Sequence, residues 1–208
     1  MMRNNNQHLT IIQGAVEGLI DEAVIKRLIG HIGANPGPVY GKRGKDYIKK
    51  HIRGFNNASK GGCWVVLVDL DTDFECAPDL RFNWLSSQEP KLCFRVAVRE
   101  IETWLLADRD RCSQFLGIPK SKIPEAVEGI ADPKQLLINL ARKSRKLLIQ
   151  SDMVPSTNSG RQVGPAYDSR LIEFVTDAQN GWRPDHAAKL SQSLEKCINC
   201  LKLLVTKP

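Results

Sequence analysis

The sequence predicts an α/β protein built on an open, mainly parallel β-sheet that is flanked by helices. Three observations indicate this fold class. Short apolar segments rich in β-branched residues alternate along the chain with segments whose apolar residues recur at helical spacing. The connections between these segments are short, as is typical of right-handed βαβ units. Acidic residues also stand where three of the expected strands end, and open α/β sheets carry their sites at that edge.

The first elements follow the βαβ pattern closely. Residues 8–13 (HLTIIQ) are typical of a first strand. The apolar residues between 19 and 32 recur at helical spacing and predict a helix, for which Gly30 and Gly33 are suitable stop signals. A short strand is then expected within residues 38–40.

The next elements complete the sheet. Asp46 is a suitable N-cap for a basic helix that runs to Phe55. Residues 63–69 form an apolar run that predicts a buried strand, and residues 92–98 predict another. A strongly apolar helical pattern follows this last strand, with Trp104, Leu105 and Leu106 expected in the core.

The remainder of the chain has a helical texture. We expect an α/β unit over residues 1–118 and a helical extension over residues 119–208, with a soft boundary between them. Helices are expected over residues 124–130, 132–150, 168–178 and 184–204. A polar loop, residues 151–165, separates the second of these helices from the third.

The stretch CWVVLVDLDTD, residues 63–73, is the centre of a predicted metal site. Alternate side chains of an extended strand share a face, so Asp69 and Asp71 are expected to lie close together, with Asp73 one step beyond the strand end. Carboxylates at the end of a buried strand repel one another unless a cation neutralises them. Mg²⁺ is the natural cation for such oxygens, and Mn²⁺ is expected to substitute for it.

Acids at two other strand ends extend this cluster. Glu17 lies where the first strand gives way to a helix, and Glu100 and Glu102 lie where residues 92–98 give way to the next helix. Solvation alone is a poor explanation for acids at three consecutive strand ends. The sequence therefore predicts a cation centre that joins the three ends.

The ordered set of Glu17, the Asp69-Leu70-Asp71 motif and a second acid resembles the Toprim domain of bacterial primases, topoisomerases and related nucleases. The resemblance covers roughly residues 1–110. Within this group the chain is most similar to nucleases named after the overcoming-lysogenization-defect protein and to small Toprim-like proteins of bacterial defence loci. The resemblance implies a Toprim-like, Rossmann-like fold.

The resemblance also implies roles for individual residues. Glu17 and Asp21 match an ExxxD pair, and Glu102 matches the acid of an SxE-like element in which Glu100 stands where the family has serine. The implied metal ligands are Glu17, Asp21, Asp69, Asp71, Glu100 and Glu102. The implied catalytic residues are Glu17, Asp69, Asp71, Glu102 and, as a late basic residue beside the scissile phosphate, Arg161.

These roles suit phosphodiester cleavage, in which metal ions position a water molecule and stabilise the attacking and leaving oxygens. Two ions about 3.5–4 Å apart need more than three carboxylates, so a second ion would depend on Asp21, Glu100 or Glu102. The resemblance thus implies a Mg²⁺-dependent nuclease that acts on DNA or RNA as the effector of a phage-defence system. It also implies a separate ATPase subunit, and this chain has no GxxxxGK[ST] motif of its own.

Composition agrees with a polyanion-binding, cytoplasmic protein. The chain has 208 residues and a formal net charge of +7, which favours binding to nucleic acid. No apolar run approaches the roughly 20 residues that span a bilayer, and the start of the chain lacks the pattern of a signal peptide. The six cysteines are expected to be reduced, and Cys197 and Cys200 are better explained as thiols on a helix face than as zinc ligands.

Two other functions stay open at this point. The DLDTD motif also resembles the DxDxT motif of haloacid-dehalogenase-like phosphatases, with Asp69 as the nucleophile, although that motif usually opens its domain. A sensor or scaffold that binds Mg²⁺ and a nucleotide without cutting is the other alternative. Oligomeric state does not follow from the sequence.

Overall fold

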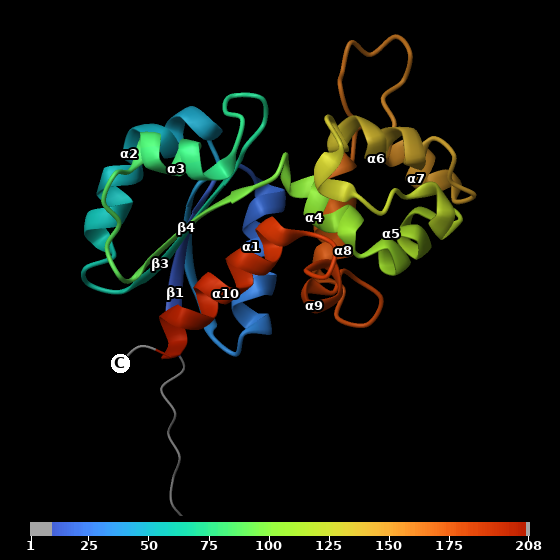
Figure 1. Cartoon of the computed structure of the whole chain (residues 1–208). Helices are drawn as coiled ribbons and strands as arrows, with labels where there is room; N and C mark the ends of the chain where they lie inside the picture. The colour runs from blue at the N-terminus through green and yellow to red at the C-terminus, as the bar shows by residue number, and fades with distance from the viewer. Residues whose placement is uncertain (1–9, 207–208) are drawn as a thin grey trace, which may run out of the picture.

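Four parallel strands in the order β2-β1-β3-β4 form the sheet of this protein (Figure 1). The computed structural model describes residues 10–206. The strands are β1 (Ile11–Val16), β2 (Asn35–Gly41), β3 (Cys63–Asp69) and β4 (Leu92–Ala97). The predicted α/β fold class, with an open parallel sheet flanked by helices, is confirmed.

Helices cover both faces of this sheet. Figure 1 shows α2 (Lys45–Ala58) and α3 (Ala77–Trp84) on one side of the strands, and α1 (Leu19–His31) and α10 (Gln192–Thr206) on the other. Every residue of β3 from Trp64 to Val68 is buried, because alternate side chains enter the two hydrophobic cores on opposite faces. A continuous apolar run is therefore the expected pattern for this strand.

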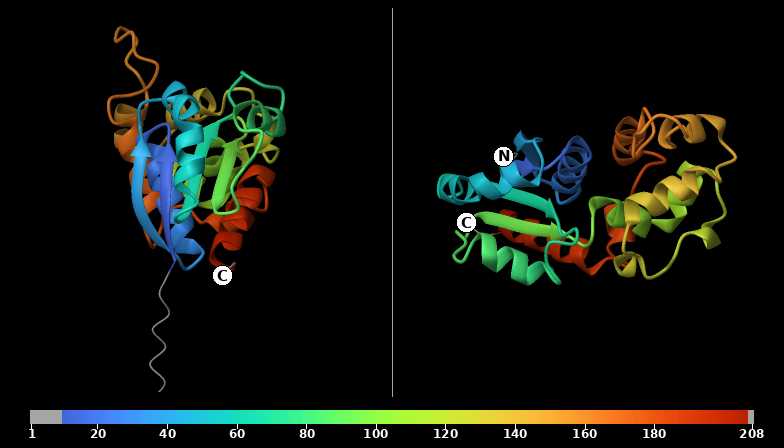
Figure 2. Two further views of the ribbon diagram at one scale, coloured as in Figure 1. Left: turned by 90° about the vertical axis from the view of Figure 1, so that its left-hand side faces the viewer. Right: turned by 90° about the horizontal axis from the view of Figure 1, so that it is seen from above.

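A group of helices lies beyond the carboxyl edge of the sheet (Figures 1 and 2). It contains α4 (Ile101–Ala107), α5 (Arg109–Leu116), α6 (Pro133–Ala141), α7 (Leu147–Met153), α8 (Tyr167–Thr176) and α9 (Pro184–Ala187), with 3-10 turns at Lys120–Lys122 and Val127–Gly129. The chain then returns to the sheet, where α10 lies against β4.

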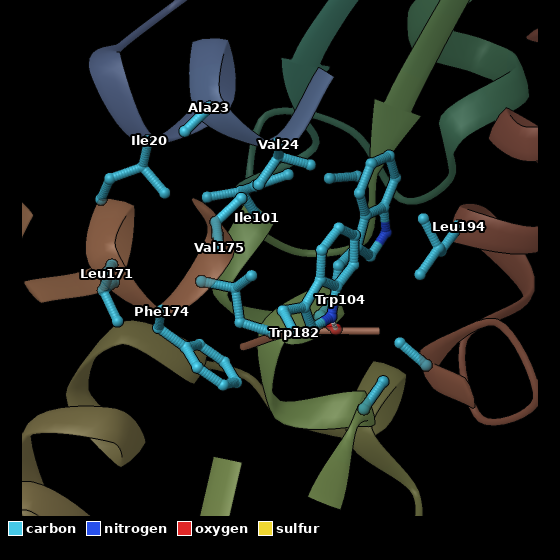
Figure 3. Packing of buried hydrophobic residues seen from close by; sticks show 14 of the residues in the cluster. Ile20, Ala23, Val24, Ile101, Trp104, Leu171, Phe174, Val175, Trp182 and Leu194 are labelled. Atoms are coloured by element: carbon cyan, nitrogen blue, oxygen red, sulfur yellow. Dashed lines mark hydrogen bonds between the residues drawn. The ribbon is translucent and has the colours of Figure 1, made fainter. Parts of the chain in front are cut away.

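Trp104 and Trp182 sit at the centre of the core that joins the helical group to α1 (Figure 3). Both side chains are fully buried. The indole nitrogen of Trp182 donates a hydrogen bond to the Trp104 carbonyl oxygen (2.9 Å), and that of Trp104 donates to Ser193 Oγ (2.7 Å). The expectation that Trp104, Leu105 and Leu106 are core residues is confirmed, since all three have 0% exposure.

The first strand and the second helix begin at other residues than the pattern predicts. The first strand spans Ile11–Val16 rather than residues 8–13, of which residues 8 and 9 lie outside the described part of the chain. Gly14 belongs to the strand because it pairs with Val39 of β2 and Val65 of β3. Glycine fits here because Ile25 and Val39 occupy the space that a Cβ would need. In the second helix, Asp46 lies in the first turn and Gly44 is the N-cap.

Three helices expected in the C-terminal half are also different. The pattern over residues 132–150 forms two helices, α6 and α7, rather than one. Only a 3-10 turn, Val127–Gly129, forms within residues 124–130. The pattern over residues 184–204 corresponds to α9 and α10, which are separate because Ser191 caps the second of them: its Oγ accepts a hydrogen bond from the Leu194 amide (3.3 Å). No helix within residues 10–206 has both the length and the apolar character needed to cross a bilayer.

Candidate functional site

The parallel registers bring three strand ends to one edge of the sheet. Val16 pairs with Leu67, and Asp69 pairs with Ala97, so β1, β3 and β4 end at similar heights. Glu17 and Asp69 therefore lie side by side. Five carboxylates gather at this edge, and we call them the acidic cluster: Glu17, Asp21, Asp69, Glu100 and Glu102.

Glu17 bridges the first and third strands. Its Oε1 accepts a hydrogen bond from the backbone amide of Asp69 (2.8 Å). Its own carbonyl oxygen accepts from the Gly44 amide (3.0 Å), which holds the start of α2 beside the cluster. Burial raises the pKa of Glu17 from 4.5 to about 7; the bond from Asp69 opposes this rise, and the charge of Asp21 adds to it.

Asp21 reaches the cluster from the first turn of α1. Its Oδ2 accepts a hydrogen bond from the Gly18 amide (3.0 Å), an arrangement that caps the helix. Its Oδ1 is shielded from solvent and has no hydrogen-bond partner among the described residues. Burial raises the pKa of Asp21 to about 6, while hydrogen bonds from backbone amides and the charge of Lys134 limit the rise.

Asp69 occupies the centre of the cluster. The residue is half-buried as a whole, yet its Oδ1 is shielded from solvent and lacks a partner among residues 10–206. Burial raises the pKa of Asp69 well above its ordinary value, and the charges of Asp21, Glu102 and Glu17 raise it further. Acids from three different elements therefore act on one carboxyl group.

Asp71 has a different geometry from the one that the strand pattern predicts. The strand ends at Asp69, and Asp71 has a positive φ of 51°, so the alternation of side chains along an extended strand does not reach it. Arg99 holds this turn: its carbonyl oxygen accepts from the Asp71 amide (2.9 Å), and its Nη1 donates to the Asp71 carbonyl oxygen (2.9 Å).

Lys45, the last residue of the basic segment GKRGK (residues 41–45), places a cation beside Asp71 and Asp73. Its Nζ lies 2.8 Å from Asp71 Oδ2 and 2.8 Å from Asp73 Oδ2, and donates to the Leu70 carbonyl oxygen (3.2 Å). Burial works to lower the pKa of Lys45, but its bonds to the two aspartates hold it above the ordinary value. Asp71 and Asp73 are thus partly neutralised from within the protein.

Glu102 lies at the first turn of α4 and is only 1% exposed. Tyr167 donates its hydroxyl to Glu102 Oε1 (3.1 Å), whereas Oε2 is buried without a partner among the described residues. Burial raises the pKa of Glu102 to about 7. The same environment raises the pKa of Tyr167, first by burial and then by the charge of Glu102, so the phenol remains a hydrogen-bond donor at neutral pH.

Lys134 and Tyr167 were not found from the sequence. The Lys134 Nζ lies 3.4 Å from Glu100 Oε1 and 3.8 Å from Glu102 Oε1, and its backbone amide donates to Glu100 Oε2 (3.1 Å). Burial works to lower the pKa of Lys134, but Glu102 and Glu100 hold it well above the ordinary value. No local pattern marks either residue, because both reach the cluster only through the packing of α6 and α8 on the sheet edge.

Arg161, the expected late basic residue, lies in a different environment. It is exposed on the loop of residues 154–166, which projects from the helical group (Figures 1 and 2). Its backbone amide donates to Ser159 Oγ (3.3 Å). Within residues 10–206, no carboxylate of the acidic cluster forms a hydrogen bond with it.

The carboxylate oxygens of the acidic cluster suit a hard cation as ligands. Asp21 Oδ1, Asp69 Oδ1 and Glu102 Oε2 are buried acceptors for which the described part of the chain supplies no donor. Such oxygens are stabilised either by a proton or by a cation. Carboxylate oxygens alone favour Mg²⁺ or a similar ion. In the described residues, however, no three His, Cys, Asp or Glu side chains already stand where they could hold a metal ion together. Binding would therefore require side chains such as Glu17 to leave their present partners.

Comparisons with protein families, with curated proteins and with solved structures gave no match for this chain. The fold is therefore described from its topology alone: it is a Rossmann-like parallel sheet of order 2-1-3-4 with a helical C-terminal region.

Proposed function

We propose that the protein is a Mg²⁺-dependent, Toprim-type nuclease. The observation that carries this proposal is the convergence of acids from three strand ends, with three buried carboxylate oxygens that have no hydrogen-bond donor among residues 10–206. A structural cluster would be expected to satisfy these oxygens, because each unsatisfied buried acceptor costs about 1–3 kcal/mol. The parallel sheet and the order of Glu17, Asp69 and Glu102 along the chain support the resemblance to the Toprim domain.

Asp21, Asp69 and Glu102 would hold the cation through their unpartnered oxygens, with Glu17 joining them when it releases the Asp69 amide. A bound Mg²⁺ ion would supply positive charge to the attacking and leaving oxygens of a phosphodiester. Tyr167 orients Glu102 by its hydrogen bond. The raised pKa values of Glu17 and Glu102, about 7 each, mean that cation binding must displace protons from the cluster at neutral pH.

Lys134 fits the role of the basic residue beside the scissile phosphate better than Arg161. Its ammonium group already lies within 4 Å of two carboxylates of the cluster, at 3.4 Å and 3.8 Å. Lys45, which pairs with Asp71, is the second lysine available to a phosphate at this edge. Both side chains neutralise negative charge without needing a fixed hydrogen-bond geometry. The net charge of +7 would favour DNA or RNA as the partner.

The experiment is cleavage of supercoiled plasmid DNA and of single-stranded RNA, in Mg²⁺ or Mn²⁺ and with EDTA as the metal-free condition. We expect cleavage that needs the metal and that falls at least about 100-fold in Asp69→Asn and Glu17→Gln, because each removes one charged ligand. The control is Glu195→Gln, an exposed acid of α10 that belongs to no ion pair in the described chain. Equal activity in the three variants would refute the assignment of the site.

A sensor that binds Mg²⁺ without cutting is the second candidate, and one observation favours it. Lys45 pairs with Asp71 and Asp73, and Lys134 lies beside Glu100, so these lysines already supply positive charge that a second metal ion would otherwise bring. Calorimetric titration of Mg²⁺ separates the two cases: binding lost in Asp69→Asn, without cleavage of either polynucleotide, would favour the sensor. Hydrolysis of a small phosphate monoester instead, through Asp69, would favour the phosphatase.

The effector role in phage defence, the ATPase subunit and the cytoplasmic location belong to the same proposal. They rest on the resemblance to the Toprim nucleases of defence loci. Copurification of a P-loop ATPase with the chain expressed from its native locus would support the two-subunit assembly.

A further inference from the structure

A cavity of about 650 Å³ lies beside β4, between α3 and the C-terminal helix α10. β4 is an edge strand, so no other strand covers this side of the sheet. None of the five residues of the acidic cluster lines the cavity, which is therefore separate from the proposed metal centre. Its volume is in the range of about 300–1,000 Å³ that is typical of small-molecule sites.

The walls of this cavity are mainly apolar. They come from the turn after β3, the start of α3, β4 and one side of α10, from Gln192 to Leu203. The apolar lining residues are Leu70, Ala77, Pro78, Val96, Val98 and Leu203. A ligand that fits here therefore has an apolar body.

Two arginines in the wall have no carboxylate partner among the described residues; Arg81 Nη2 donates only to the neutral Gln88 Oε1 (2.9 Å). Arg81 comes from α3 and Arg95 from β4. Within residues 10–206 neither guanidinium forms a salt bridge, and the Nε atoms of both are shielded from solvent without a hydrogen-bond partner. Burial lowers the pKa of Arg81, and the nearby charge of Arg95 lowers it further. Two like charges held close together in a partly dry wall favour an anion between them.

The two acids of the lining do not fill this role. Glu128 Oε1 accepts hydrogen bonds from Ser191 Oγ (2.7 Å) and the Ser193 amide (2.7 Å). Glu75 is exposed at the rim. Lys196, a third lining cation, donates to Gln192 within its own helix (2.9 Å).

A thiol of the CxxC motif faces the same arginines. Cys200 is a free, half-buried thiol that lines the cavity. A hydrogen bond from Cys93 lowers the pKa of Cys200 to about 7 against the opposing effect of burial, and the charges of Arg95 and Arg81 lower it further. The two arginines thus stabilise the thiolate form of Cys200. A bound anion would compete with this thiolate for the positive charge of the arginines.

We propose that this cavity binds a small amphipathic anion, with an oxyanion group held by Arg81 and Arg95 and an apolar body against Val96, Val98 and Leu203. Guanidinium groups suit this ligand class because their planar donors match the geometry of carboxylate, phosphate or sulfonate oxygens. The site does not depend on the nuclease proposal, since it shares no residue with the acidic cluster.

The experiment compares two dyes of the same shape in fluorescence titrations of the full chain. 8-Anilinonaphthalene-1-sulfonate carries an oxyanion, and N-phenyl-1-naphthylamine is its uncharged counterpart. We expect saturable binding of the anionic dye, at least about 10-fold tighter than that of the neutral one, because a charge-assisted pair of hydrogen bonds is worth that factor or more. Arg81→Met and Arg95→Met should each weaken binding of the anionic dye about 10-fold or more.

Arg53→Met is the matched control, because Arg53 is exposed on α2 and does not line the cavity. Equal affinity for the two dyes, or losses in the two lining variants no larger than in Arg53→Met, would overturn the proposal.

A second measurement needs no variant and so does not depend on whether the substitutions fold. The anionic dye should slow the alkylation of Cys200 by iodoacetamide at pH 7 at least about 3-fold, with each modified peptide quantified by mass spectrometry. Cys63, a half-buried thiol outside the cavity, is the internal control. An unchanged rate at Cys200, or equal slowing at Cys63, would place the dye elsewhere and contradict the proposal.

Discussion

Glu17 and Glu102 are carboxylic acids whose pKa values lie close to the pH of a cell. For both, burial is the largest cause of the rise from 4.5 to about 7. Water solvates a carboxylate far better than the strand ends do, and the neighbouring acids of the cluster add repulsion. Small changes in pH or in cation concentration therefore change the charge of the edge at which these residues lie.

The first prediction at the residue scale concerns stability against pH. The folded state binds the protons of Glu17 and Glu102 more tightly than the unfolded chain does. Their stabilising contribution is thus complete below about pH 4.5 and is lost as the pH rises through about 7. With EDTA present, we expect Glu17→Gln to be more stable relative to the wild type at pH 8 than at pH 5, as measured by urea unfolding.

Glu195→Gln is the control for this series, because its carboxyl group is exposed outside the cluster. A difference between Glu17→Gln and the wild type that stays constant between pH 5 and pH 8 would contradict the raised pKa. Addition of Mg²⁺ at pH 8 should stabilise the wild type more than Glu17→Gln, since a bound cation replaces the protons.

The second residue-scale prediction concerns Lys134. Lys134→Met leaves Glu100 and Glu102 without their counter-charge. We expect a loss of about 1–3 kcal/mol at pH 8, below the roughly 3–5 kcal/mol of a fully buried pair because Lys134 is partly exposed. The loss should shrink at pH 5, where Glu102, whose pKa is about 7, is largely protonated and needs less counter-charge.

Lys120→Met is the matched control, since Lys120 pairs with the exposed Asp110 on the surface. It should cost less than about 1 kcal/mol at either pH. Equal losses in the two lysine variants would show that Lys134 acts as an ordinary surface cation.

At the scale of elements, the close approach of β1 to α1 and β2 decides where the acids lie. Gly14 allows Ile25 and Val39 to pack directly over the first strand, so α1 lies near enough for Asp21 to reach the cluster. The N-terminal turn of α1 is fixed by the bond from the Gly18 amide to Asp21 Oδ2 (3.0 Å). The site therefore depends on a contact in the middle of the strand.

A substitution in β1 tests this dependence. In Gly14→Ala the new Cβ would clash with Ile25, which must shift, and we expect a loss of about 1–3 kcal/mol in urea unfolding. Gly54→Ala is the control because nothing lies within 4 Å of its Cβ position on α2. This control should be neutral or up to about 1 kcal/mol more stable, owing to the higher helix propensity of alanine. A Gly14→Ala protein as stable as Gly54→Ala would contradict the close contact.

At the scale of the whole molecule, elements from the N-terminal and C-terminal halves of the chain pack into one hydrophobic core. The C-terminal helix α10 lies against β4, and α8 lies against α1. Cys197 and Leu201 of α10 share a hydrophobic cluster with Val65 of β3 and Cys93 of β4. The division into residues 1–118 and 119–208 stays a prediction. Because the two parts share this packing, the division can be tested by removing the second part.

The test is the fragment of residues 1–118, which contains all four strands. Without α8 and α10, the apolar face of α1 and one face of β4 meet water, so we expect no cooperative thermal transition by circular dichroism. The full-length chain, which keeps both helices, should unfold in one sharp transition. A sharp transition in the fragment would support the division into two units.

The sequence by itself determined the parallel α/β fold and the acids that follow its strands. These are local properties: the apolar run 63–69 predicts a buried strand, and the order of strands and helices predicts which edge Glu17, Asp69 and Glu102 share. Element bounds were less certain, as at Asp46, because caps depend on single hydrogen bonds and turn conformations.

Only the tertiary structure decided which cations accompany these acids. Lys45 reaches Asp71 through the turn that gives Asp71 its positive φ, and Lys134 and Tyr167 reach Glu102 through the packing of α6 and α8. Arg81 and Arg95 likewise lie close together only because α3 packs beside β4. Such contacts join residues far apart in the chain, and their energies depend on burial, which no local pattern of residue types encodes.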